Sequence, residues 1–482
     1  MFLGLDFGTS SVKAVLVDGE QRVVARADVH LAISSPASDR RQKDPEDWWR
    51  ALLAIMEELG QHHSRDVGAI KAIGLSGRMR GAVLLDATGA VLRPCILWND
   101  GRAAVECRLL EARLPDLAAI TGNVAAPGFT APKLLWVRRH EPEIFARVAT
   151  VLLPKAWIRC RLTGELIEEM SDASDTLWLD TGKRDWSDAA LSATGLDRSA
   201  MPRLVEGAAP AGRLRPVLAM RWGIETPPLL AGGAGDNAAG AVGLSAIEPG
   251  DAFISLGSSG ALWVTTGVFA PYPRAAAHAF CHALPGLWRQ MGVTLSAGAS
   301  LAWWAGVTGL TEAELLEEVA GDVAPREPLC LPYLAGERTP HNDAGRRGAF
   351  AGSSFGDERR HLTQAVMEGV AFSLRDRLDA VRASGTAVQE ANVIGGGSRS
   401  AAWVQMLASA LDLPLHRIEG GELAAAFGAT RLARLAFTGE SVAAVCAPRG
   451  RLESVLPDPS LRDAYARQPG RYRQLGAATR PI

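Results

Sequence analysis

Two hydroxyl-rich turns are the features of this sequence best suited to holding phosphate groups. Gly8-Thr9-Ser10 follows an apolar run that contains Asp6, and Gly257-Ser258-Ser259 follows a similar run near the middle of the chain. Each turn offers backbone N–H groups and hydroxyls to phosphate oxygens, and Lys13 adds a positive charge after the first turn. A single turn of this composition is typical of a β-hairpin. Its repetition favours a pair of phosphate-binding turns.

Two aspartates supply the other parts that phosphoryl transfer requires, a metal ligand and a base for the incoming hydroxyl. Asp6 lies in an apolar run, where an unpaired carboxylate is costly. We therefore expect either a cation such as Mg²⁺ beside it or a hydrogen bond to the turn at Thr9. Asp236 follows the glycine-rich stretch 229–235, at the expected start of a helix. It is either an N-cap or the base that accepts the hydroxyl proton.

Two further segments are candidates for ligand contacts. Trp98-Asn99-Asp100 places an aromatic ring and polar side chains after a short strand, as a polyol pocket requires, although Asn-Asp-Gly also predicts a simple turn. Gly395-Gly396-Gly397 follows an apolar run and precedes an expected helix, so the backbone could approach a nucleotide there. The sequence contains no G-x-x-x-x-G-K-[ST] motif, so bound ATP would not rest on a P-loop.

The elements that position these residues indicate a duplicated α/β architecture. Both hydroxyl turns stand between two apolar runs, which predicts two β-hairpins. Helical and strand patterns alternate between the hairpins, and Asp44 followed by Pro45 predicts a helix start. A chain of 482 residues is too long for one hydrophobic core. We expect domains at 1–225 and 226–482 with a ligand cleft between them, and the stretch 202–228 as the boundary region.

Composition and charge restrict the classes of ligand. The formal net charge of −2 provides no basic field to attract nucleic acid. The start of the chain lacks the basic and apolar regions of a signal peptide, and no run of about 18 apolar residues could span a bilayer. The six cysteines occur without a CxxC pair. These features predict a cytoplasmic protein with reduced thiols that binds neither nucleic acid nor a membrane.

Taken in chain order, the motifs resemble the FGGY family of carbohydrate kinases. The segments that carry the resemblance are Asp6 to Ser10, Trp98 to Arg102, Gly235 to Gly240, Leu256 to Gly260 and Gly395 to Gly397. Three longer segments, 127–136, 280–285 and 331–342, extend it over nearly the whole chain. The resemblance implies two actin-like, ribonuclease-H-like domains that close on ATP and Mg²⁺. It also implies phosphorylation of a ketopentose, D-xylulose, at its 5-hydroxyl, and it allows a homodimer.

The resemblance further implies roles for individual residues. Asp236 would be the base, and Asp6 would lie near the metal together with Asp236. The sugar would lie near Met79, Arg80, Asp236 and Asn237, in addition to Trp98, Asn99 and Asp100 considered above. The nucleotide would lie near Gly396, Gly397 and Ser400, in addition to Gly8, Thr9, Ser10, Lys13, Gly257, Ser258 and Ser259.

One segment departs from the family pattern. Members that act on D-xylulose generally show Gln-Met-His where this chain has Arg78-Met79-Arg80. Arg80 thus replaces a neutral or titrating ring by a permanent cation, which is better matched to a carboxylate or phosphate. Either Arg80 faces the sugar and favours another polyol or an acidic sugar, or it turns outward or pairs with Asp100 and leaves the pocket unchanged. A third reading is a non-catalytic actin-like protein that binds ATP, in which Asp236 only caps a helix.

Overall fold

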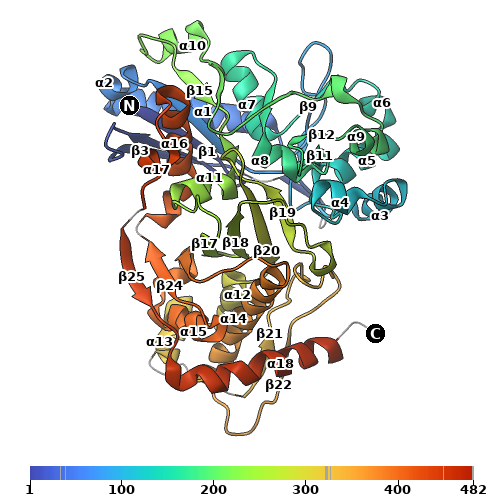
Figure 1. Ribbon diagram of the computed structural model, residues 1–482, viewed down its shortest axis with the longest axis vertical. Helices are drawn as coiled ribbons and strands as arrows, with labels where there is room; N and C mark the ends of the chain where they lie inside the picture. The colour runs from blue at the N-terminus through green and yellow to red at the C-terminus, as the bar shows by residue number, and fades with distance from the viewer. Residues whose placement is uncertain are drawn as a thin grey trace. The chain divides into compact units, whose positions relative to one another are not determined.

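The computed structural model describes residues 1–32, 34–37, 40–320, 324–325, 327–418, 420–448 and 450–479. They form two compact units, and Figure 1 shows the elements of each. Unit 1 comprises Met1–Ile247, Phe280–Trp288 and Leu423–Pro448, and unit 2 comprises Glu248–Ala279, Arg289–Glu422 and Arg449–Ile482. The stretch 202–228, expected at the boundary, lies within unit 1 and contributes β14 (Pro210–Arg213) to its sheet. The two units therefore divide the chain differently from the expected division after residue 225. That division stays a prediction about the duplicated halves of the sequence.

The sheet of unit 1 has seven strands in the order β14-β15-β6-β1-β2-β3, and β16 also pairs with β6. Their bounds are β1 (Phe2–Phe7), β2 (Ser11–Val17), β3 (Val23–His30), β6 (Ala72–Gly77), β15 (Leu229–Ala231) and β16 (Ala234–Gly235). β1 and β2 form the expected hairpin around the first hydroxyl turn, with Asp6 opposite Lys13. β1 and β6 run parallel, with Asp6 opposite Ser76. Asp6, Lys13 and Ser76 therefore lie in one row across the sheet.

Helices pack on both faces of this sheet. On one face, Leu3, Leu5 and Phe7 share a core with α1 (Pro45–His62) and α7 (Pro154–Thr163). Asp44 caps α1 by accepting a hydrogen bond from Glu46 N, as its sequence predicts. On the face of Gly4 and Asp6 lies α16 (Ala424–Thr438). A Cβ at Gly4 would collide with the carbonyl oxygen of Ala426, so glycine is required for this close approach.

The sheet of unit 2 has the order β19-β20-β18-β17-β23-β24-β25. The bounds are β17 (Ala252–Leu256), β18 (Gly260–Thr266), β19 (His278–Cys281), β20 (Trp288–Thr294), β23 (Ala391–Ile394), β24 (Leu415–Ile418) and β25 (Arg451–Val455). β17 pairs antiparallel with β18 across the second hydroxyl turn and parallel with β23, as β1 does with β2 and β6. This repeated topology confirms the predicted duplicated α/β fold.

The core of unit 2 is completed by helices from its second half. Residues of α12 (Gly298–Thr308), α14 (Arg359–Ala383) and α15 (Ala401–Leu411) contribute to one hydrophobic cluster with β17 and β18. Tyr465 and Tyr472 of α18 (Arg462–Ala478) are buried in the same cluster. The C-terminal helix is therefore part of the core.

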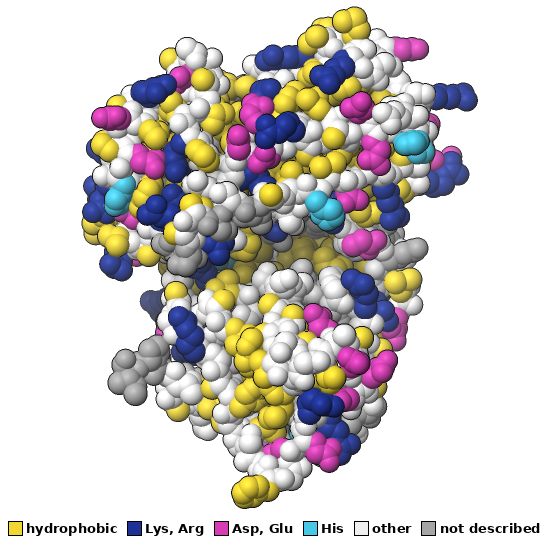
Figure 2. Space-filling view, turned by 180° about the vertical axis from the view of Figure 1, so that it is seen from behind, with side chains coloured by type: hydrophobic (Ala, Val, Ile, Leu, Met, Phe, Trp, Pro, Cys, Tyr) yellow, Lys and Arg dark blue, Asp and Glu magenta, His cyan; other side chains and the backbone are white. Residues whose placement is uncertain are grey.

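The surface carries charges of both signs. On the face shown in Figure 2, Lys and Arg are intermixed with Asp and Glu, as the net charge of −2 leads one to expect. None of the helices formed by the described residues combines the length and apolarity needed to cross a bilayer.

Candidate active site

Asp6 and Asp236 lie at the ends of β1 and β16, the strands that pair with β6 on its two sides. β16 runs parallel to β6 with Gly235 opposite Gly77, and α11 (Asp236–Gly243) begins at the next residue. Ser76 Oγ on β6 donates a hydrogen bond of 2.9 Å to Asp6 Oδ1. Loss of hydration raises the pKa of the Asp6 carboxyl, and the charge of Asp236 raises it further, while the Ser76 hydrogen bond opposes the shift. The two carboxylates are thus close enough to repel each other.

Asp236 is the first residue of α11 and not its cap. The N-cap is Gly235, which has no side-chain capping hydrogen bond. Oδ1 of Asp236 accepts hydrogen bonds from Asn237 N at 2.7 Å and Asn237 Nδ2 at 3.0 Å. Oδ2 accepts one from Arg78 Nη1 at 2.7 Å. Capping therefore does not explain why a carboxylate stands here.

Arg78 ties Asp236 to the first hydroxyl turn. Its backbone N donates to Phe7 O at the end of β1, and its Nε donates to Thr9 Oγ1 at 3.0 Å. Trp98 Nε1 donates to the same hydroxyl at 3.4 Å, and the guanidinium carbon lies 5.3 Å from the centre of a Trp98 ring. In the sequence, Arg78 stands out only as a departure from the family pattern. Its long-range contacts make it part of the same cluster as Asp236.

The Arg80 side chain neither turns out into solvent nor pairs with Asp100; it pairs with Asp175. Its Nε donates to Asp175 Oδ1 at 2.7 Å. Asp100 is buried and instead accepts hydrogen bonds from Arg41 N and from Nε and Nη2 of Arg102. The expectation that Arg80 turns outward or pairs with Asp100 is therefore wrong.

The other residues proposed for the sugar differ in their surroundings. Met79 is buried and packs against the turn before Asp236, since a Cβ at Gly235 would lie 2.7 Å from Met79 Cγ. Trp98 contacts Thr9 and the guanidinium of Arg78, as described above. Asn99 is exposed, and Asp100 holds Arg102 in place. The sugar contacts of all these residues stay predictions.

The residues expected near phosphate fall in both units. Gly8, Thr9, Ser10 and Lys13 lie in unit 1, where Gly8 N donates to Ser11 O and closes the turn. Ser258 and Ser259 in unit 2 are exposed. The carbonyl oxygens of Gly257 and Ser258 accept hydrogen bonds from the backbone at the start of α12.

The glycine triplet of unit 2 precedes a capped helix. Gly395 has a φ of 93°, which favours glycine, and Gly396 is exposed. Ser400 caps α15 by accepting a hydrogen bond of 3.3 Å from Trp403 N. Its hydroxyl therefore has a structural task in addition to the predicted nucleotide contact.

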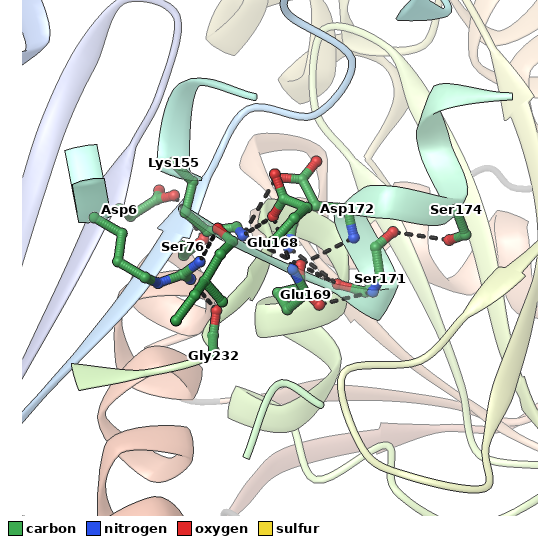
Figure 3. A network of polar contacts seen from close by, with 12 residues as sticks. Asp6, Ser76, Lys155, Glu168, Glu169, Ser171, Asp172, Ser174 and Gly232 are labelled. Atoms are coloured by element: carbon green, nitrogen blue, oxygen red, sulfur yellow. Dashed lines mark hydrogen bonds and ion pairs between the residues drawn. The ribbon is translucent and has the colours of Figure 1, made fainter. Parts of the chain in front are cut away.

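A buried ion network supports the turn that carries Asp236 (Figure 3). Among the residues that the structure describes, Glu168, Glu169 and Asp172 come close enough together to hold a metal ion. Lys155 Nζ lies 2.8, 3.3 and 3.5 Å from their carboxylate oxygens, so an ammonium group already occupies the position of a cation. We therefore assign no metal to this cluster.

The network reaches Asp236 through α8 (Met170–Ala173). Glu169 accepts hydrogen bonds from the backbone N of Ser171 and Asp172, and Ser171 Oγ accepts one of 3.1 Å from Gly235 N. This network was not predicted from the sequence. Its signal was a lysine at a buried helix start followed by several acids within 168–175, but spacing alone does not show that these residues are buried together.

The residues around Asp6 fit Mg²⁺. No hydrogen bond from a described residue reaches Asp6 Oδ2, while Oδ1 has only Ser76. Mg²⁺ prefers carboxylate oxygens and usually needs one or two of them, with water and phosphate completing its coordination. A cation would also relieve the repulsion between Asp6 and Asp236.

Comparisons with known proteins match the chain along almost its whole length. The model for the FGGY family of carbohydrate kinases, N-terminal domain, matches residues 1–243, and that for the C-terminal domain matches residues 252–437. The xylulose kinase of Escherichia coli (strain K12) is 46% identical over 485 residues, which cover 100% of both chains. That of Bacillus subtilis (strain 168) is 36% identical over 436 residues, 89% of this chain and 87% of the relative.

Solved structures show the same fold. The xyloylose kinase from Brucella ovis superposes with a TM-score of 0.97 at 48% identity, and 99% of each chain is covered. The xylulose kinase from Rhodospirillum rubrum gives a TM-score of 0.92 at 29% identity, covering 99% of this chain and 98% of the other.

Proposed function

Since this chain belongs to the FGGY family of carbohydrate kinases, we propose that it transfers the γ-phosphoryl group of ATP to the 5-hydroxyl of D-xylulose. The full-length similarity to proteins named xylulose kinase supports the choice of sugar. The observation that carries the mechanism is the Asp236 carboxylate. It stands in the first turn of α11, with a side chain 17% exposed, beside Asp6 and in hydrogen-bond contact with Arg78.

Asp236 accepts the proton of the attacking hydroxyl in this proposal. A carboxylate within hydrogen-bond reach of a sugar hydroxyl is a competent general base. Arg78 and Asn237 hold its two oxygens in a fixed orientation. Asp6 would hold Mg²⁺, with Asp236 close by, and the ion when bound neutralises charge on the phosphates.

The remaining assignments rest on position and chemistry. The backbone and hydroxyls of Gly8, Thr9 and Ser10, with Lys13, serve the phosphates from unit 1. In unit 2 the same task falls to Gly257, Ser258 and Ser259, and the nucleotide lies near Gly396, Gly397 and Ser400. The exposure of Ser10, Ser258, Ser259 and Gly396 supports these roles, because their polar groups are accessible to a ligand. A cytoplasmic location and a homodimer are proposed on the family resemblance.

The test is ADP release by the purified protein with ATP, Mg²⁺ and D-xylulose. We expect turnover by the wild type, and a fall of kcat by about 10²–10⁴-fold in Asp236→Asn with ATP binding retained. Asp185→Asn, which removes one partner of an exposed ion pair in unit 1, serves as the control and should leave kcat unchanged.

Each other outcome selects a different reading. Full activity of Asp236→Asn would remove Asp236 as the base. A wild type that ignores D-xylulose but turns over another polyol or a sugar acid would favour the alternative substrates. ATP binding without turnover of any sugar would favour the non-catalytic reading.

A further inference from the structure

The backbone of Arg80 is fixed in an unusual conformation. Its φ is 72°, in the left-handed region that residues other than glycine rarely adopt. The carbonyl oxygen of Arg80 accepts hydrogen bonds from Thr130 Oγ1 at 3.2 Å and from Lys133 Nζ at 2.8 Å. Both donors come from α5 (Thr130–His140) and are buried. The surroundings thus hold the strained backbone in place.

The side chain of Arg80 is fixed as well. Its guanidinium carbon lies 4.2 Å from the ring centre of Phe129 and 5.5 Å from that of Phe280. Its Nε donates to Asp175 Oδ1, and the Asp175 side chain has no exposed surface. The Arg80 side chain keeps 14% exposure, and none of the described residues accepts a hydrogen bond from Nη1 or Nη2. Both terminal nitrogens of a rigid guanidinium are therefore available to donate to a ligand.

The segments that carry Arg80 and Asp175 both contact the turn that leads into Asp236. Arg80 follows Met79, which packs against Gly235, the residue before Asp236. Asp175 is four residues after Ser171, and Ser171 Oγ accepts a hydrogen bond from Gly235 N. Arg80 and Asp175 thus lie in segments that contact the turn before Asp236.

We propose that Asp175 is a positioning residue that makes this pocket select an uncharged sugar over a sugar acid. The proposal rests on the proposed function, because it concerns the sugar at the Asp236 site. Asp175 compensates the charge of Arg80 at 2.7 Å, so a ligand meets the field of an ion pair, which falls off faster than that of a lone cation. The Nη groups still donate hydrogen bonds to a neutral oxygen. Arg80 is therefore compatible with D-xylulose as long as Asp175 is present.

The experiment compares D-xylulose with D-xylonate, the five-carbon sugar acid, in the wild type and in Asp175→Asn. Binding of each compound is measured by calorimetry, and kcat and KM by ADP release. The wild type should prefer D-xylulose. In Asp175→Asn the ratio of D-xylonate affinity to D-xylulose affinity should rise about tenfold or more, since a charge-assisted hydrogen bond is gained with the anion. The KM for D-xylulose should rise while kcat changes little, because the variant disturbs the orientation of Arg80 and not the base.

Two further variants separate charge from structure. Arg80→Gln/Asp175→Asn removes both charges, so it should also raise the KM for D-xylulose, but without any gain for D-xylonate. Asp175→Ser, which leaves room for water beside Arg80 Nε, replaces Asp175→Asn if circular dichroism shows that variant unfolded. Asp185→Asn is the matched control and should match the wild type for both compounds.

The outcomes distinguish this inference from the proposed function. Equal losses for both compounds in the Asp175 variants would show a merely structural role and overturn the inference. A wild type that binds D-xylonate as tightly as D-xylulose would also overturn it, whichever variants fold. A wild type that binds neither compound and transfers no phosphate to D-xylulose would overturn the proposed function itself.

Discussion

Arg78 Nη1 and Asp236 Oδ2 form an ion pair of 2.7 Å that links a residue after β6 to the first turn of α11. The same guanidinium donates to Thr9 Oγ1 in the turn after β1. One side chain therefore joins the proposed base to the proposed phosphate-binding turn. Its charge also acts on Asp6, because it lowers the pKa of that carboxyl against the effects of burial and of Asp236.

Arg78→Gln is expected to shift the acid limb of the pH profile of kcat/KM. Loss of the positive charge raises the pKa of Asp6 further, so its carboxylate becomes protonated at a higher pH. Because the proposed metal ligand is the ionised form, activity should be lost at a higher pH than in the wild type. Arg198→Gln, at an exposed ion pair, should leave the limb unchanged. An unshifted limb in Arg78→Gln would contradict the electrostatic role.

Lys155→Met is expected to destabilise unit 1 strongly. The substitution leaves Glu168, Glu169 and Asp172 buried without the ammonium group between them. Breaking a buried network in this way costs about 3–5 kcal/mol of unfolding free energy, to be measured by urea unfolding. Lys183→Met, which removes an exposed partner of Asp180, should cost less than about 1 kcal/mol. Similar losses in the two variants would argue against the network.

The sequence predicted what is local and missed what joins distant residues. The two hairpins, the start of α1 at Asp44 and the helix start at Asp236 follow from turn and capping chemistry over a few residues. Arg78 and Asp236 are 158 positions apart, and Arg80 and Asp175 are 95 apart. No local pattern indicates which carboxylate a given arginine meets, because the sheet and α8 bring them together only in the folded chain. For the same reason the predicted pairing of Arg80 with Asp100 is wrong: Arg80 meets Asp175 instead.

Asp172→Asn is expected to stabilise the protein at neutral pH. Burial, followed by the neighbouring carboxylates, raises the pKa of Asp172 well above its ordinary value of 3.8, although Lys155 opposes the shift. Neither of its oxygens has a hydrogen bond from a described residue. Between the unfolded and folded pKa values the native state binds more protons, so wild-type stability falls as pH rises through that window.

The asparagine variant lacks this titration. Its thermal midpoint should therefore exceed that of the wild type by a margin that grows from pH 4 upward. Asp28→Asn, at an exposed position, provides the baseline for removing a carboxylate. A lower midpoint for Asp172→Asn at pH 7 would show that the ionised carboxylate stabilises the fold.

Lys133→Met is expected to reveal a buried lysine that loses its proton near pH 7 in the folded protein. Burial lowers the pKa of Lys133 to about 7, and its Nζ donates to Arg80 O. In the unfolded chain the amine keeps its ordinary pKa of about 10.4, so between these values the unfolded state binds more protons and wild-type stability rises with pH. Urea midpoints should be measured from pH 6 to 9. Above pH 7 the midpoint of the wild type should rise relative to that of Lys133→Met, while the difference between the wild type and Lys183→Met should stay constant. Parallel curves for Lys133→Met and the wild type would mean that Lys133 stays charged in the folded protein, and its hydrogen bond to Arg80 would then be that of an ammonium group.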